Sequence, residues 1–400
     1  MMNLIPVELI HEIFSRLPVK SIARCRCVSE QWRSILCSVY FTELFLTKSS
    51  TRPSLFFAME SSTNNNEFIF FSSPQFDDKS LSSSAASVQL KLSKDMPLKF
   101  CGHASGLFCL RRMPISKEAG DEKEEYTQHV ICNTSTGQYG FLPRVRTGSK
   151  SFLGFDPIDK VFKVVSSNST YSSRTNVVNV FTLGIGEVEW RKINSPLDHY
   201  PWSKGICIYG VLYYLALGLH ATTFYIVCFD VRSEKFKFMD TYKFTHYTTR
   251  LINYEGKLGL VRWTAYSESI MTMWVLEDVE KHDWSEHLFT LPGDKFSGFV
   301  SVVGVTATGE IVLMNNSYHS NPFYVFYFHP GRNTVKRLEV QGFENHGGSR
   351  VYAFVDHVDD LTFNMKSWQL HQDETITNQY FVDTSLTHDT KKLKKLAVCH

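Results

Sequence analysis

The sequence predicts a mostly β protein that begins with a small helical module. Three observations lead to this fold class. Apolar side chains recur at helical spacing over the first 46 of the 400 residues, and from residue 55 onwards the spacing becomes that of strands. Aromatic residues make up 14% of the chain, a composition typical of strands. Finally, a turn that runs into an apolar strand recurs about every 50 residues.

The first expected helix follows Pro6, which suits a first helical turn because its missing N–H is not needed there. Pro18 cannot continue this helix, so the segment ends at Leu17. One stripe of the segment is apolar: Leu9, Ile10, Ile13, Phe14 and Leu17.

Two more helical segments are expected before residue 46. The second buries three residues: Ile22, Cys25 and Val28. Ser29 is the expected N-cap of the third. Its apolar positions follow the spacing i, i+3, i+4, i+7: Trp32, Ile35, Leu36 and Val39.

This stretch resembles the F-box, the helical module that docks on the Skp-type adaptor of SCF ubiquitin ligases. The matching residues are Ile5-Pro6, Leu9-Ile10, Ile13-Phe14, Ser15 to Ile22, Arg24, Arg26 to Val28 and Trp32 to Ser34. Ser29-Glu30 departs from the Cys-Lys pair common in plant members. The resemblance implies an adaptor-binding set: Ile5, Pro6, Leu9, Ile10, Ile13, Leu17, Pro18, Ile22, Val28 and Trp32.

The size of the module independently indicates a partner surface. A unit of roughly forty residues buries too little surface to be stable alone. Its apolar side chains point to more sides than three short helices can cover, and such leftover apolar surface usually marks a partner site. The alternative is a helical cap that packs only on the rest of its own chain.

Composition excludes several function classes. A net charge of +2 gives no electrostatic case for nucleic acid binding, and no apolar window is long enough to span a membrane. Nine cysteines without a C-x-x-C pair indicate free thiols, and so a cytoplasmic or nuclear protein. We find no nucleophile, metal-ligand or phosphate-loop motif, and therefore expect no enzyme, no cofactor and no metal.

The repeat after residue 102 rests on two tracks of turns. The first track marks a turn before an apolar strand, with spacings of 53, 51, 46 and 53 residues: Gly106, Asp159, Gly210, Gly256 and Gly309. The second marks the polar end of a later strand, with spacings of 50, 47, 48 and 51 residues: Asn133, Leu183, Asp230, Asp278 and His329. Four strands per unit at this period predict a kelch-like β-propeller.

Six blades are the expected count, and seven remain possible. Five units lie between residues 102 and 340, and strands from both chain ends (55–92, and 351–355 with 361–365) would share the sixth. A pair of β-sandwiches is the alternative. It predicts a polar outer face, whereas strands such as Phe323 to Phe328 are apolar on both faces.

The repeat region also resembles the F-box-associated domain of plant F-box proteins. The matching stretches are Val130 to Gly137 with Leu142-Pro143, Phe152 to Asp156, and Lys160 to Val165. The expected domains are therefore an F-box at 1–46, a linker at 47–54, a propeller at 55–375 and a C-terminal tail at 376–400.

The resemblance implies a substrate-recognition subunit of an SCF-type ubiquitin ligase. Its F-box would bind the adaptor, and through it a cullin scaffold, while the propeller binds an unknown target protein. Candidate target-binding residues come from three loops: Arg144, Arg146, His199, Trp202, Tyr318 and His319. Two alternatives stay open: an F-box protein that works outside a ligase, and a propeller that binds a small molecule or sugar.

One cluster of acids and histidine is interpreted as a turn exposed to solvent. It consists of Asp356, His357, Asp359 and Asp360, and it follows a predicted strand near the C-terminus. A metal or acid–base site would require side chains that orient these groups, and the sequence shows none.

Overall fold

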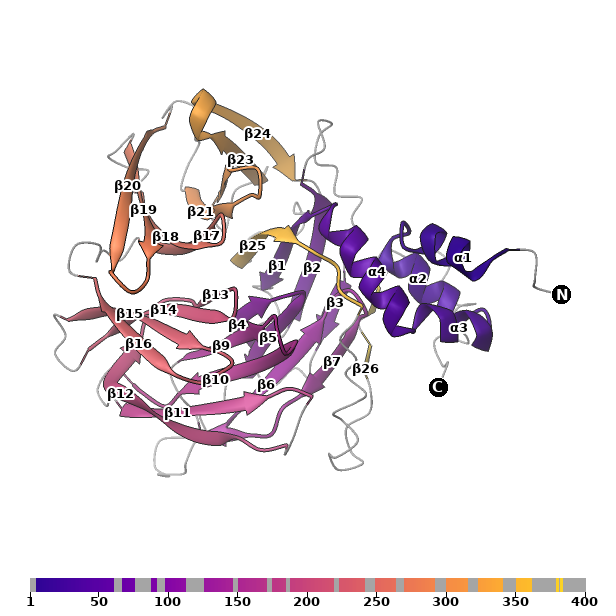
Figure 1. Cartoon of the computed structure of the whole chain (residues 1–400), viewed down its shortest axis with the longest axis horizontal. Coiled ribbons are helices and arrows are strands. Elements are labelled where there is room, and N and C mark those ends of the chain that lie inside the picture. The colour runs from indigo at the N-terminus through magenta and orange to yellow at the C-terminus, as the bar shows by residue number, and fades with distance from the viewer. Residues whose placement is uncertain are drawn as a thin grey trace.

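The structure is a computed structural model, shown in Figure 1. It describes residues 5–60, 67–75, 88–91, 98–112, 126–146, 150–170, 175–184, 188–218, 223–241, 249–263, 270–291, 300–315, 323–340, 350–361, 379–380 and 382–383. Helices pack together at one side of the molecule, and strands make up nearly all of the rest (Figure 1).

Four helices form the N-terminal module, where the sequence predicts three. They are α1 (Val7–Phe14), α2 (Val19–Arg26), α3 (Glu30–Leu36) and α4 (Val39–Ser50). Ser29 caps α3 as predicted, because its hydroxyl accepts the backbone N–H of Trp32 at 3.1 Å. The prediction of three helices was wrong because Ser38 adopts an extended backbone and caps a fourth, accepting the N–H of Phe41 at 3.2 Å.

The core of the helical module is apolar and includes one residue from the far end of the chain. Phe14 meets Trp32 edge to face, with ring centres 5.0 Å apart. Leu361 packs into the same cluster, so the helices are not separate from the strands. The buried members are Phe14, Val19, Ile22, Leu36, Phe41, Phe45 and Leu361. None of these helices is long and apolar enough to cross a membrane.

Within the described residues the strands form five antiparallel sheets. The first sheet contains β25 (Arg350–His357), β1 (Ser54–Glu60), β2 (Glu67–Pro74), β3 (Val88–Lys91) and β27 (Val382–Asp383). The second contains β4 (Leu98–Ala104), β5 (Leu107–Arg112), β6 (Tyr126–Asn133), β7 (Gln138–Phe141), β8 (Val145–Arg146) and β26 (Gln379–Tyr380).

The third sheet is the largest of the described part. It contains β9 (Lys150–Asp156), β10 (Val161–Ser167), β11 (Thr175–Thr182), β12 (Arg191–Pro201), β13 (Ile206–Ile208), β14 (Val211–Leu217), β15 (Phe224–Asp230) and β16 (Phe236–Asp240). Strand β12 joins two groups, because Arg191 to Asn194 pair with β11 whereas Tyr200 and Pro201 pair with β14.

The two remaining sheets have four strands each. One contains β17 (Arg250–Tyr254), β18 (Lys257–Arg262), β19 (Ile270–Asp278) and β20 (Asp283–Thr290). The other contains β21 (Val300–Val305), β22 (Ile311–Asn315), β23 (Phe323–His329) and β24 (Thr334–Val340), with the short 3-10 helix η2 (Pro330–Arg332) between its last two strands.

Both turn tracks of the sequence lie at hairpins. The first-track turns at Ser105-Gly106, Tyr209-Gly210 and Glu255-Gly256 have positive φ at both residues. Two such residues match the twist of a tight hairpin. In the second track the strand-end side chain holds the turn: the Asp278 carboxylate, for example, accepts the N–H groups of Glu280 and Lys281.

Strands from the two chain ends share the first sheet, as the sequence predicts. Strand β25 pairs with β1, and Phe57 lies opposite Ala353. Residues 362–365, which the sequence also assigned to this sheet, lie outside the described residues. Since β25 and β1 are about 290 residues apart in the chain, their pairing closes the circle of sheets.

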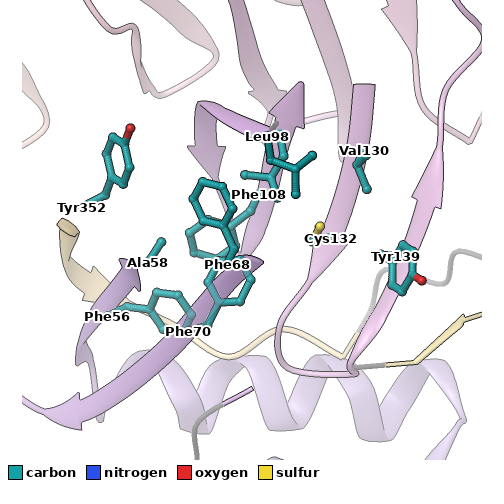
Figure 2. Close-up of a cluster of buried hydrophobic side chains, with 11 residues drawn as sticks. Phe56, Ala58, Phe68, Phe70, Leu98, Phe108, Val130, Cys132, Tyr139 and Tyr352 are labelled. Carbon is teal, nitrogen blue, oxygen red and sulfur yellow. The ribbon is translucent and has the colours of Figure 1, made fainter. Parts of the chain in front are cut away.

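The sheets stack through apolar side chains on both of their faces. In β23, Val325 and Tyr327 pack in one buried cluster, whereas Phe326 and Phe328 pack in another. Figure 2 shows a further cluster, in which rings from β1, β2 and β5 meet. Phe56 stacks on Phe108 there, with ring centres 4.9 Å apart. Burial on both faces agrees with stacked blades and not with a sandwich, whose outer faces are polar.

Candidate functional site

The outer side of the helical module carries exposed apolar residues. Leu9 and Ile13 lie four positions apart in α1, and therefore on one face of this helix. Each has 53% of its surface exposed, and Ile5, just before the helix, has 54%. The opposite side of α1 holds buried Phe14, so these three apolar residues are left over after the module has folded.

Three further exposed apolar residues lie on the neighbouring helices. Val28, which follows α2, is 64% exposed, and it belongs to the set implied by the resemblance. Val39 and Tyr40, at the start of α4, are 72% and 63% exposed and were not in that set. The rings of Tyr40 and His11 lie 4.9 Å apart, which places Tyr40 beside α1. The sequence feature that could have identified Val39 and Tyr40 is their position as an apolar pair directly after the cap residue Ser38.

The other members of the implied adaptor-binding set have different surroundings. Ile10, Leu17 and Trp32 are half-buried, and they pack against the core of the module. Pro6 and Pro18 are exposed, and each directly precedes a helix. Ile22 is fully buried, so it supports the module from within and offers no surface to a partner.

An ion pair fixes α1 on α4 beside this surface. The Glu12 carboxylate pairs with Lys48 of α4 at 3.3 Å and also with Arg16, which follows α1. Hydrogen bonds from Arg16 and Lys48 lower the pKa of Glu12. Arg52, which follows α4, donates to the carbonyl oxygens of Ser15 and Arg16 at 3.2 Å. The exposed face of α1 is therefore held in a fixed position.

The candidate target-binding residues on the propeller do not share one environment. Arg144 and Arg146 are exposed, and Trp202 is half-buried. His199 is fully buried, and its ring nitrogens lie 2.8 Å from the Tyr214 hydroxyl and 3.0 Å from the Leu197 carbonyl oxygen. Burial lowers the pKa of His199, so this residue supports the fold and presents no binding surface. Tyr318 and His319 lie outside the described residues.

The acid–histidine cluster is not the solvent-exposed turn that the sequence suggested. His357 and Asp360 are buried, at 2% and 5% exposure. The Asp359 N–H donates to Ser49 of α4, and the Asp360 carbonyl oxygen accepts from Asn133 of β6. The interpretation was wrong because the sequence could not show that this segment passes between the helices and the propeller.

A cavity of about 390 Å³ lies along the axis of the propeller. Strands β4, β13, β17, β21 and β25 line it. His103 belongs to this wall, and one of its ring nitrogens lies 3.4 Å from a ring nitrogen of His357, which stands behind the wall. Burial lowers the pKa of both, that of His357 to about 3. The histidines are thus neutral. No group of three or more metal-ligating side chains occurs among the residues that the structure describes.

Comparison with known families identifies both parts of the chain. The F-box domain matches residues 2–44, and the F-box associated beta propeller domain matches residues 54–358. The second match covers more than half of the 400 residues. The apolar face of α1 lies within the first match, and the axial cavity lies within the second.

Similar proteins occur in Arabidopsis thaliana. The F-box protein At3g57590 is 45% identical, with 91% of this chain and 92% of the relative aligned. The F-box protein DOR is 44% identical, with 89% and 93% aligned. Two other relatives, At1g33020 and At1g30925, are longer, and this chain spans 66% of each.

Solved structures resemble the chain only distantly. TolB from Acinetobacter baumannii aligns with 75% of this chain and 66% of its own, at 9% identity and a TM-score of 0.43. A likeness at that level carries no argument about function. The family is shown by the two family matches and by the relatives that are 44–45% identical. These proteins are non-catalytic adaptors, and their F-box implies binding to a Skp-type adaptor. This chain belongs to the F-box proteins whose second domain is an F-box-associated β-propeller.

Proposed function

We propose that this protein is the target-recruiting subunit of an SCF-type ubiquitin ligase. The observation that carries the proposal is the exposed apolar face of α1 within the F-box match, formed by Ile5, Leu9 and Ile13. The face would bind a Skp-type adaptor and, through it, a cullin scaffold. The propeller would hold a target protein near the ubiquitin-loaded enzyme, so that the subunit acts through proximity and not through chemistry of its own.

The docking surface would extend from α1 to the neighbouring exposed residues. Val28, Val39 and Tyr40 add apolar area, and the ring contact between Tyr40 and His11 supports a continuous patch. Pro6 and Pro18 are exposed at the helix starts and would lie at its edge. Because the ion pair between Glu12 and Lys48 fixes α1, little ordering would be needed on binding.

We further propose that the propeller has six blades. Strand β12 divides the largest sheet into two four-stranded groups, and the other four sheets would each count as one blade. We expect the complete protein to act in the cytoplasm or the nucleus, where SCF-type ligases work.

Co-expression with a Skp-type adaptor tests the proposal. In the variant Leu9→Glu, Ile13→Glu, two charges enter the apolar face at positions that are half exposed already. We expect this protein to fold but to bind the adaptor at least about 30-fold more weakly, which corresponds to a loss of about 2 kcal/mol. Affinity of the purified chains by calorimetry gives the number.

A matched control places the same two charges on the propeller. Ile270 and Leu288 are 47% and 67% exposed on β19 and β20, so Ile270→Glu, Leu288→Glu is expected to bind the adaptor like the parent. If the α1 variant stays folded and still co-purifies one-to-one with the adaptor, the proposed docking face is wrong. Turnover of propeller-bound proteins, measured with and without the proteasome, separates a ligase subunit from an F-box protein that works outside a ligase.

A further inference from the structure

Basic residues stand at or near the beginnings of β4, β9, β13, β17 and β25 around the axial cavity, whereas β21 begins with Val300. Lys150, Arg250 and Arg350 are the first residues of β9, β17 and β25. Lys99 is the second residue of β4, and Lys204 stands two positions before β13. We call these five residues the basic mouth, because the beginnings of the inner strands surround one end of the cavity.

The basic mouth is accessible and opens into the cavity. Lys204 and Arg250 line the cavity directly, and Tyr352 forms the wall beside them. The Lys204 ammonium lies 4.0 Å from the centre of the Tyr352 ring, whose hydroxyl donates to Glu60 at 3.2 Å. Lys99, Lys204, Arg250 and Arg350 are exposed, and Lys150 is half-buried. A ligand at this end of the cavity would contact Lys204 and Arg250 directly, with the charges of the other three residues around it.

The basic mouth lies at the end of the cavity that faces away from the helices. The inner strands run from the mouth towards the F-box: β9 is followed by a turn whose Lys160 pairs with Glu43 of α4 at 2.9 Å. Strand β25 is followed by the segment that places Leu361 in the helical core. A partner bound at the mouth would therefore not collide with an adaptor bound on α1.

The cations of the mouth act on one another. Loss of hydration, together with the charges of Arg250, Arg350 and Lys150, lowers the pKa of Lys204 to about 7. The Glu60 carboxylate opposes them. Loss of hydration likewise lowers the pKa of Lys150, with contributions from Arg111, Lys99 and Arg350. These positive charges repel one another, and an anion bound among the five side chains would offset that repulsion.

We propose that the basic mouth is a binding site for a phosphoryl group. Several cations around one opening favour a dianion over a single carboxylate, and the arginine guanidinium forks match phosphoryl oxygens. The cavity below the mouth has the volume of a small-ligand site. The phosphoryl group would belong either to a free phosphate ester or to a phosphorylated side chain of a target. The second source rests on the proposed function, whereas anion binding itself does not.

Pyrophosphate is the first probe, with the full chain in a phosphate-free buffer of low ionic strength. We expect the melting temperature to rise with pyrophosphate concentration and to saturate, as binding to the native state requires. Calorimetry should give one site per chain. The double variant Lys204→Met, Arg250→Met should lose at least tenfold in affinity, and a charge-matched control, Lys192→Met, Lys235→Met, should lose less than twofold.

The free proteins show whether the variant has folded. Removal of two mutually repelling cations should raise the melting temperature without ligand, so a loss of pyrophosphate binding cannot be explained by unfolding. Equal pyrophosphate affinity in the parent and in the mouth variant would overturn the proposal, and so would a parent without saturable binding. Adaptor binding by all these proteins is measured separately, so a failure of the α1 face would be recognised on its own.

Peptides distinguish the two sources of the phosphoryl group. The probe is a short glycine–alanine peptide that carries one phosphoserine, compared with its unphosphorylated twin. Tighter binding of the phosphopeptide than of pyrophosphate supports a target side chain as the occupant, and tighter binding of pyrophosphate supports a free ester. In both cases the Lys204→Met, Arg250→Met variant must bind the tighter of the two probes more weakly than the parent does. If its affinity is unchanged, the phosphoryl group binds elsewhere and the proposal is wrong.

The pH dependence of sulfate binding tests whether Lys204 attracts the anion through its charge, which a merely structural role would not require. Sulfate is suitable because its own charge stays constant between pH 6 and pH 8.5. Lys204 must be protonated to attract it, so affinity should fall as the pH rises through about 7. Facing Lys204 are Lys150 of β9, Arg250 of β17, Arg350 and Tyr352 of β25, and Glu60 of β1. In Lys204→Arg the charge persists, and the pH dependence should disappear while binding remains. An unchanged pH dependence in this variant would contradict the assigned role of Lys204.

Discussion

At the residue scale, Lys204 shows how a binding site and stability conflict. In the unfolded chain the pKa of a lysine is near 10.4, whereas in the fold that of Lys204 lies at about 7. Between these values the unfolded chain binds more protons, so this residue makes the native state less stable as the pH falls from about 10 to about 7. The full penalty remains below pH 7.

Replacing Lys204 by methionine should therefore raise the melting temperature at pH 7. The gain over the parent should shrink as the pH approaches 10, because the Lys204 ammonium of the parent then loses its charge. Thermal unfolding of both proteins between pH 6.5 and pH 10, without phosphate, gives the two curves. Parallel curves would mean that Lys204 keeps its ordinary pKa. The stacking of Lys204 on Tyr352 is lost in the variant and reduces the gain slightly.

Single residues also show where the sequence was sufficient and where it was not. The cap at Ser29 follows from local rules, because the hydroxyl and the N–H that it accepts are three residues apart. The burial of His199 depends on Tyr214, whose hydroxyl lies on a different strand. Likewise, the segment at Asp359 and Asp360 contacts α4 and β6, which lie more than 200 residues earlier. Contacts of this kind leave no local pattern.

At the element scale, the cap at Ser38 divides one predicted helix into two. Its hydroxyl accepts the N–H of Phe41, and the exposed pair Val39 and Tyr40 follows directly. Ser38→Ala should lower the stability of the full chain by about 1 kcal/mol, the usual loss for a helix cap. Urea unfolding followed by helix circular dichroism measures it. Ser34→Ala, on the exposed side of α3, is the control and should change stability little.

The strands were easier to predict than the helix ends. Two-residue turns with positive φ, such as Tyr209-Gly210 and Glu255-Gly256, favour glycine, which makes them recognisable in the sequence. First-track turns recur in four of the five sheets of the described residues, and the recurrence made the period of about 50 residues visible in the sequence. The end of α4 had no such signal: the helix continues to Ser50, four residues past the predicted boundary of the module.

At the scale of the whole molecule, acid should open the fold through its buried histidines. Burial lowers the pKa of His129 and His357 to about 3 and holds that of His103 well below its usual value. In the unfolded chain each would have a pKa near 6.5. The unfolded chain thus binds more protons below pH 6.5, and stability should fall steadily as the pH falls from about 6.5 towards 3.

Melting temperatures at pH 7.5, 6.5, 5.5 and 4.5 check this expectation. At His129 the surroundings add to the effect of burial, because Arg111 lies near and opposes a positive charge on the ring. At His357 the Asp359 carboxylate, 3.9 Å away, would favour a charged ring, but burial outweighs it and the pKa stays at about 3. His129→Gln should reduce the dependence on pH, because glutamine can meet Ser151 without titrating. A variant with the same slope as the parent would exclude His129 as a contributor.

The pairing of β25 with β1 also sets an order of events during synthesis. Strands β1 and β2 leave the ribosome early, but the partner of β1 is made about 290 residues later. At ordinary elongation rates of about 5–20 residues per second, the edge of β1 that pairs with β25 stays unpaired for roughly 15–60 s. The helical module is complete long before that, except for Leu361. A nascent chain can therefore present its F-box while its propeller is still open, and that interval is when chaperones have access to the unpaired edge.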